Sequence, residues 1–192
     1  MWQGVEIVSF RIVDLEDIAR LVIAERKLCT TISTVIPESV QGAAGWYSVE
    51  NDTVHIDKRC DDLSISEIYT MVHELRHAEQ YTYPQEFSPL IGMNLSHVIM
   101  YDGTARKRSN DTWLTCKVSG EPDYLRELYL RSPMEVDAND FARSWLTRCL
   151  PKCQQEIERS YMFWCPPFRL LSEADAEQLY WDLFNFIEKN AK

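Results

Sequence analysis

The residues best suited to chemistry lie in one short segment, His73-Glu74-Leu75-Arg76-His77. Residues four apart share one face of an α-helix, so His73 and His77 can each direct a ring nitrogen at one metal ion. Glu74 lies about 100° around the helix from His73. It is badly placed to bind that ion, but it can reach a water molecule bound to the ion and take a proton from it. The segment therefore predicts a zinc site with His73 and His77 as ligands and Glu74 as general base.

A catalytic zinc ion also needs a third protein ligand and an open position for water. One known spacing places glycine at position 80 and a third histidine at position 83, but this chain has Gln80 and Tyr83. That arrangement is excluded. The third ligand must therefore come from farther along the chain, and the candidates are Glu135, Asp137, His97 and Asp102.

Glu135 has two possible roles. It ends the segment Ser132-Pro133-Met134-Glu135, which has the form of a capping box, and there it only satisfies the start of a helix. At 100° per residue, however, Glu135 falls inside the apolar arc of that helix and Asp137 falls outside it. The arc consists of Met134, Ala138, Phe141, Ala142, Trp145 and Leu146. A carboxylate on the apolar, core-facing side of a helix is unfavourable unless it interacts with a cation. We expect Glu135 to be the third ligand, with Asp137 and His97 as alternatives.

The elements around the motif can be read from local patterns. A strand is predicted at Val5–Val13, followed by a helix that Asp14 caps. The segment Gly45–Asp57 predicts a hairpin, because two strand-like runs flank a turn-forming Asn-Asp pair. The motif itself lies on an amphipathic helix that Ser66 caps and that ends before Pro84.

The rest of the chain predicts an irregular insertion at about residues 83–121 and then helices. One helix begins at Pro122 and another runs from Pro133 to Cys149. A helical extension at about 151–192 follows, and Ser172 is predicted to cap its last helix. The apolar face expected for that helix is Leu179, Tyr180, Leu183, Phe186 and Ile187. We therefore expect a single α+β domain, with a small sheet, a hairpin, a motif helix and a helix-rich C-terminal half.

Composition narrows the choice of partners. The 192 residues carry a formal net charge of −10, which disfavours nucleic acid and anionic membranes because both would be repelled. The first residues lack the pattern of a signal peptide, and no apolar run approaches the length of a membrane span. We expect a soluble, cytoplasmic protein that contacts no membrane.

Two segments resemble a known family. Residues 73–80, His-Glu-Leu-Arg-His-Ala-Glu-Gln, and residues 133–142, Pro-Met-Glu-Val-Asp-Ala-Asn-Asp-Phe-Ala, resemble the zincin metallopeptidases, more narrowly the ImmA/IrrE-type and related phage-encoded peptidases. The resemblance covers about residues 43–82 and 121–150. It implies a zincin-like core in which a hairpin precedes the motif helix and a later helix brings an acidic ligand. It implies His73, His77 and Glu135 as zinc ligands. The insertion and the C-terminal extension depart from the family pattern.

The resemblance implies a zinc metallopeptidase that hydrolyses a protein or peptide substrate. Zinc would lower the pKa of its water, and Glu74 would take the proton and return it to the leaving amine. The alternative is a catalytically silent zinc-bearing protein that acts by binding a partner. The intact Glu74 favours the enzyme, because a binding module needs no base beside the water.

Overall fold

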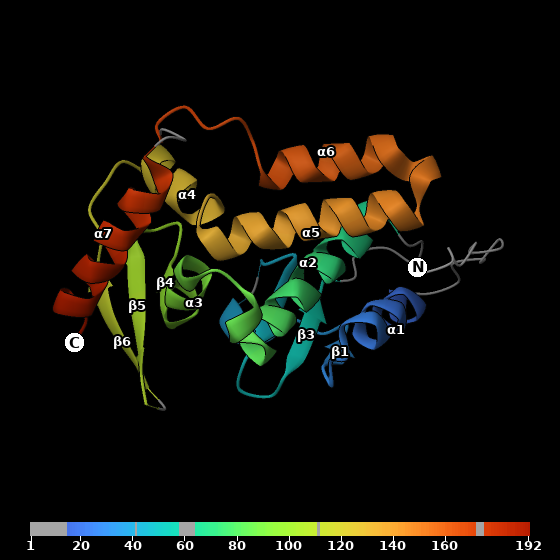
Figure 1. Cartoon of the computed structure of the whole chain (residues 1–192), viewed down its shortest axis with the longest axis horizontal. Helices are drawn as coiled ribbons and strands as arrows, with labels where there is room; N and C mark the ends of the chain where they lie inside the picture. The colour runs from blue at the N-terminus through green and yellow to red at the C-terminus, as the bar shows by residue number, and fades with distance from the viewer. Residues whose placement is uncertain (1–14, 41, 58–63, 111, 172–174) are drawn as a thin grey trace. The chain divides into compact units, whose positions relative to one another are not determined.

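The computed structural model describes residues 15–40, 42–57, 64–110, 112–171 and 175–192 (Figure 1). The strand predicted at Val5–Val13 and the caps predicted at Asp14 and Ser172 lie outside the described residues.

The residues of the chain group into two compact units. One unit comprises Met1–Ala78 and Phe141–Ser160, and the other comprises Glu79–Asp140 and Tyr161–Lys192. The division points fall inside three helices, Ile65–Thr82, Pro133–Cys149 and Gln154–Trp164, and each of these helices contributes residues to both units. Helical periodicity continues across all three points, so no local pattern marks them.

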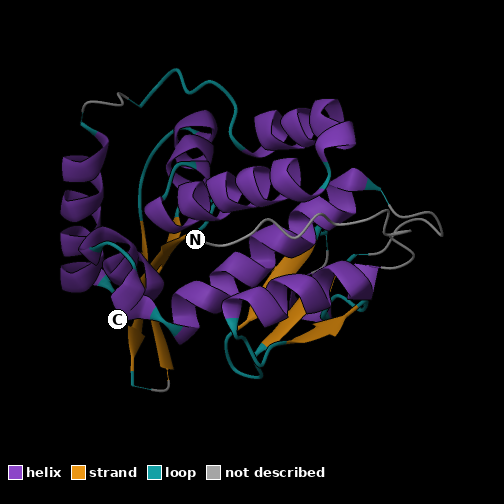
Figure 2. Ribbon diagram, turned by 45° about the vertical axis from the view of Figure 1, so that its right-hand side comes forward, coloured by secondary structure: helices purple, strands orange, loops and turns teal. Residues whose placement is uncertain are grey.

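The first unit contains a three-stranded sheet (Figure 2). Strand β3 (Thr53–Ile56) lies in the middle, parallel to β1 (Thr31–Ser33) and antiparallel to β2 (Gly45–Ser48). The predicted hairpin is thus confirmed, while β1 is too short to give a sequence signal. Val54 and Ile56 are fully buried, as expected of alternate residues that face a core.

Helix α1 (Leu15–Arg26) buries Leu15, Ile18 and Val22. Glu25 in its last turn forms hydrogen bonds with the later helix Pro133–Cys149. The Glu25 carboxylate accepts hydrogen bonds from Trp145 Nε1 at 2.9 Å and from the Arg148 guanidinium at 2.8 Å.

Helix α2 (Ile65–Thr82) carries the motif, as predicted, but its N-terminal cap is Ser64 and not Ser66. The Ser64 hydroxyl accepts a hydrogen bond from the Glu67 backbone N–H, and the Glu67 carboxylate accepts one from the Ser64 backbone N–H. This reciprocal pair is a capping box. Ser66 is the second residue of the helix, and its carbonyl accepts a hydrogen bond from the Thr70 hydroxyl. The spacing Ser64-x-x-Glu67 predicts the helix start correctly, whereas Ser66 has no glutamate three residues later.

The segment expected to be an irregular insertion is regular. A 3-10 turn (η2, Pro84–Glu86) and helix α3 (Pro89–Ser96) precede an antiparallel sheet of order β4-β5-β6. Its strands are β4 (His97–Ile99), β5 (Thr104–Ser109) and β6 (Thr112–Lys117). Strand β5 reads Thr-Ala-Arg-Lys-Arg-Ser, so only Ala105 marks an apolar face. The alternation is too weak to reveal a strand, and pairing with neighbours creates it.

Helices α4 (Pro122–Leu130) and α7 (Ala176–Asn190) complete the core of the second unit. Its buried members are Ile99, Ala105, Leu125, Leu128, Leu171, Tyr180, Leu183, Phe184 and Ile187. The prediction for the last helix was wrong at Phe186, which is 42% exposed, whereas Phe184 is fully buried. Phe184 lies one turn from Tyr180, so it shares the face centred on that tyrosine.

Helices α5 (Pro133–Cys149) and α6 (Gln154–Trp164) run side by side in Figure 1, joined by a 3-10 turn (η3, Pro151–Cys153). Arg143 and Glu158 link them through two hydrogen bonds of 2.8 Å. The start and end of α5 agree with the prediction. No helix in the described ranges is both long enough and apolar enough to cross a membrane.

Candidate metal centre

Three predicted residues come together in the structure. His73 and His77 on α2 and Glu135 on α5 each offer one ligand atom, and these atoms all lie within 4.8 Å of one another. All three residues are buried, with exposed fractions between 5% and 8%. Two imidazoles and one carboxylate form a donor set that suits zinc and leaves a fourth position open. The cluster could therefore hold a metal ion.

The two imidazoles converge on one point. His73 Nε2 and His77 Nε2 are 3.0 Å apart, and the rings are nearly perpendicular, with centroids 4.6 Å apart. Two nitrogens bound to one tetrahedral zinc ion, each at about 2.0–2.1 Å, are separated by about 3.3 Å. The observed separation is close to that value. The histidine pair thus needs almost no rearrangement to bind an ion.

Glu74 lies next to the histidines on α2 and packs against the start of strand β2. A methyl group added at Gly45 would lie 3.0 Å from Glu74 Cγ and 3.3 Å from Glu74 Oε1. The same methyl group would lie 2.5 Å from Thr70 Cγ2. Gly45 therefore leaves the space in which the half-buried Glu74 side chain sits.

A buried polar network fixes the first turn of α5, where Glu135 lies. The Met134 backbone N–H donates to Asn94 Oδ1 at 3.1 Å. The Met134 carbonyl accepts from Gln80 Nε2 at 3.0 Å. Gln80 and Asn94 have exposed fractions of 0% and 1%. Because both backbone groups of Met134 are held by side chains, the position of the adjacent Glu135 is fixed.

Helix α2 also contacts α5 through the ring of Phe141. The guanidinium of Arg76, between the two histidines in sequence, lies 4.7 Å from the centre of the Phe141 ring. The guanidinium of Arg26 lies 4.9 Å from the same ring centre. Cation–π contacts of this geometry stabilise by about 0.5–2 kcal/mol, depending on solvent access.

The alternative ligands have other partners. Asp137 Oδ2 accepts a hydrogen bond of 2.8 Å from Gln80 Nε2, so Asp137 orients the residue that holds Met134. Asp102 is exposed, and hydrogen bonds from Lys117 and Thr104 lower its pKa to about 2. Neither belongs to the cluster around His73 and His77.

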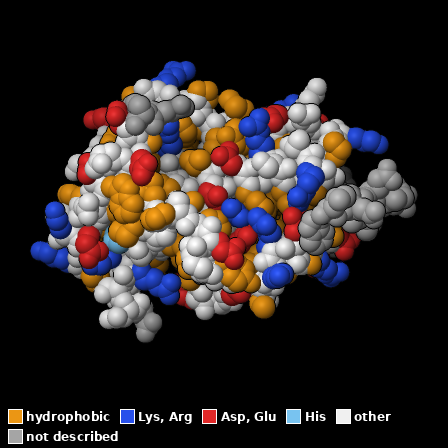
Figure 3. Space-filling model, in the orientation of Figure 1, with side chains coloured by type: hydrophobic (Ala, Val, Ile, Leu, Met, Phe, Trp, Pro, Cys, Tyr) orange, Lys and Arg blue, Asp and Glu red, His pale blue; other side chains and the backbone are white. Residues whose placement is uncertain are grey.

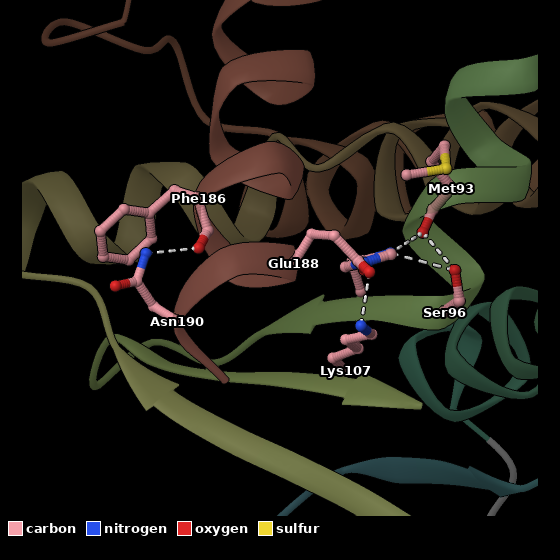
Figure 4. Close-up of polar contacts among 7 residues, drawn as sticks. Met93, Ser96, Lys107, Phe186, Glu188 and Asn190 are labelled. Carbon is pink, nitrogen blue, oxygen red and sulfur yellow. Dashed lines mark hydrogen bonds and ion pairs between the residues drawn. The ribbon is translucent and has the colours of Figure 1, made fainter. Parts of the chain in front are cut away.

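His97 lies in strand β4 beneath α7. Its Nε2 atom is 2.9 Å from Glu188 Oε2, and its Nδ1 atom is 3.1 Å from the Met93 carbonyl oxygen and 3.0 Å from Ser96 Oγ. Glu188 of α7 also accepts a hydrogen bond from Lys107, as Figure 4 shows. His97 therefore links the sheet to the last helix and takes no part in the cluster.

Sequence reasoning missed Gly45, Gln80 and Asn94. One signal was present, since a glutamine on the apolar side of the motif helix predicts a buried hydrogen bond, as a buried amide requires a partner. Gly45 and Asn94 carry no comparable signal, because their roles depend on which elements pack together.

Comparison with models of protein families, with curated proteins and with solved structures finds no match to this chain.

Proposed function

We propose that this protein is a zinc-dependent metallopeptidase in which His73, His77 and Glu135 bind the metal and Glu74 is the general base. One observation carries the proposal: two imidazole nitrogens 3.0 Å apart share a buried cluster with a carboxylate. Two imidazole nitrogens and one carboxylate oxygen are donor atoms that zinc takes in catalytic sites. A divalent ion satisfies all three side chains.

Zinc, when bound, supplies a Lewis acid that lowers the pKa of water and polarises a carbonyl oxygen. The protein side chains supply the rest. Glu74 takes a proton from the attacking water and returns it to the leaving nitrogen. Gly45 keeps open the volume in which Glu74 sits, and Gln80 and Asn94 hold the turn that carries Glu135.

Peptide bonds are the proposed substrate on two grounds. The residues of the two helices resemble the zincin peptidases. The order of elements agrees with that resemblance, since the β2-β3 hairpin comes directly before α2 and the acidic ligand comes from a later helix. We therefore propose a zincin-like core formed by sheet β1–β3, α2 and α5.

Metal binding tests the ligand set first. Wild-type protein is expected to bind about one zinc ion per chain, and a variant with His73→Ala and His77→Ala is expected to bind none. Metal content is measured by mass spectrometry after dialysis against trace zinc. Full zinc content in the double variant would falsify the site.

Turnover is tested with Glu74→Gln, which keeps the size of the side chain and removes its ability to accept a proton. Hydrolysis should fall by about 10² or more, while zinc content and melting temperature hardly change. The substrate screen is a digest of unfolded proteins and peptide libraries, read by mass spectrometry.

Glu67→Gln is the matched control, because Glu67 lies on the same helix but serves its capping box. This variant should lose stability and keep its activity per folded molecule. If zinc-loaded wild-type protein cuts nothing that the Glu74→Gln protein leaves whole, the peptidase proposal fails and the zinc-bearing binding protein replaces it.

A further inference from the structure

The sheet β4-β5-β6 has two faces of different character. Ala105 and Lys107 of β5 point to the inner face, where Ala105 is fully buried and Lys107 contacts Glu188 of α7 (Figure 4). Successive side chains of a strand alternate between faces. Arg106 and Arg108 therefore share the outer face, and both are exposed.

The outer face carries three cations and one aromatic ring. In the register of β5 and β6, Arg108 lies opposite Trp113, Arg106 lies opposite Thr115, and Thr104 lies opposite Lys117. Side chains directly opposite one another on a sheet are neighbours, with Cβ atoms about 4.5–5.5 Å apart. The half-exposed indole of Trp113 is thus bordered by a guanidinium. We call Arg106, Arg108, Trp113, Thr115 and Lys117 the basic face.

The basic face differs from the remainder of the protein. The chain has a formal net charge of −10, and acidic and basic side chains are mixed over the surface shown in Figure 3. Lys117 has an acidic partner in Asp102, at 2.9 Å. Arg106 and Arg108 form no ion pair with any residue that the structure describes. Two exposed guanidiniums on one strand of an acidic protein are complementary to an anionic partner.

We infer that the basic face binds single-stranded nucleic acid, with Arg106, Arg108 and Lys117 contacting phosphates and Trp113 stacking on a base. Flat arrays of cations with an exposed aromatic ring suit single strands, because unpaired bases offer their faces for stacking. A duplex keeps those faces inside its own stack. The net negative charge of the whole chain disfavours such a partner. At short range, however, salt screens the cations of the basic face least, so their attraction for a phosphate can exceed the repulsion from acidic groups farther away.

Fluorescence anisotropy with a labelled oligo-dT of about 16 nucleotides tests the inference. Three phosphate contacts predict that the logarithm of the association constant falls with the logarithm of salt concentration with a slope of about −2. The variant with Arg106→Gln and Arg108→Gln should bind more weakly, with a slope of about −0.7. Trp113→Leu should weaken binding about tenfold and keep the wild-type slope, since stacking releases no counterions.

Two controls separate this face from total charge and from folding. Arg20→Gln with Lys152→Gln removes the same charge at exposed positions elsewhere and should leave binding unchanged. Arg106→Lys with Arg108→Lys keeps the charges and should keep the salt slope. The variant lacking His73 and His77 should bind as the wild type does, because the basic face does not depend on the metal site.

Three outcomes would overturn the inference. The first is absence of binding at low salt. The second is an equal affinity for a duplex of the same length, which would remove the role of Trp113. The third is equal competition by polyglutamate, which would assign the basic face to acidic proteins.

Discussion

Gly45→Ala is expected to disturb the general base without removing the metal. The added Cβ would lie 2.5 Å from Thr70 Cγ2 and 3.0 Å from Glu74 Cγ. Ordinary carbon contacts are about 3.5–4.0 Å, so the first overlap is about 1 Å. Thr70 is buried and β-branched, and its rotamer in a helix is restricted. The strain must therefore be relieved by movement of β2 or of α2.

Gly45→Ala should lower both the stability of the protein and its rate of hydrolysis. Overpacking of this kind costs about 1–3 kcal/mol, which for a protein of this length lowers the melting temperature by about 2–12 °C. A displacement of Glu74 approaching 1 Å reduces hydrolysis by up to about 10²-fold. The three heavy atoms nearest to the added methyl group belong to Thr70 and Glu74, and none belongs to His73 or His77. Zinc content should therefore stay near the wild-type value.

Two companion variants separate stability from catalysis. Thr70→Ser removes Cγ2 and keeps the hydroxyl that donates to the Ser66 carbonyl. Combined with Gly45→Ala, it should restore much of the melting temperature but little of the hydrolysis, because the contact with Glu74 remains. Gly92→Ala is the control, since a methyl group there meets nothing within 4 Å, and it should stabilise helix α3 by about 0.5–1 kcal/mol. Wild-type hydrolysis and melting temperature in Gly45→Ala would refute the reasoning.

Three further outcomes are expected. Glu135→Gln should weaken zinc binding strongly in a metal titration while Asp137→Asn weakens it much less, and the reverse order would move the ligand to Asp137. Gln80→Met keeps the apolar volume but removes the donor to Met134, so zinc affinity should fall by about 10–100-fold, and an unchanged affinity would show that this hydrogen bond does not position the ligand. Burial raises the pKa of Glu25, but hydrogen bonds from Arg148 and Trp145 outweigh it and leave the pKa below 4.5. A lowered folded-state pKa stabilises the protein above pH 4.5 and is lost as pH falls below that value, so Glu25→Gln should flatten the acid side of the unfolding profile, and identical profiles would contradict the assignment.

The parts of the fold that the sequence predicts are those with local causes. The β2-β3 hairpin follows from two strand-like runs and a turn pair between them, and Asp52 in that turn has a φ of +49°. Helix α2 follows from its periodicity. Helix phase alone placed Glu135 on the packed side of α5, and the structure brings it to the two histidines.

The parts that could not be predicted depend on long-range packing. Strand β5 has little apolar alternation, and it is a strand because β4 and β6 pair with it. The contact of Asn94 with Met134 joins residues 40 positions apart, and that of Gln80 joins residues 54 apart. No local pattern encodes such partners. The cap of α2 is Ser64 and not Ser66, because only Ser64 is followed by a glutamate three residues later.

The two hydrogen bonds that hold Met134 have a consequence for how the protein behaves when metal is withdrawn. In small zinc domains the ion organises the chain, and chelators unfold it. Here Asn94 and Gln80 anchor the beginning of α5 through protein groups alone, so that turn does not need the ion to form. Chelation should leave the circular dichroism spectrum essentially intact, and re-addition of zinc should proceed at a rate set by diffusion into a ready-made cluster, with no slow refolding phase.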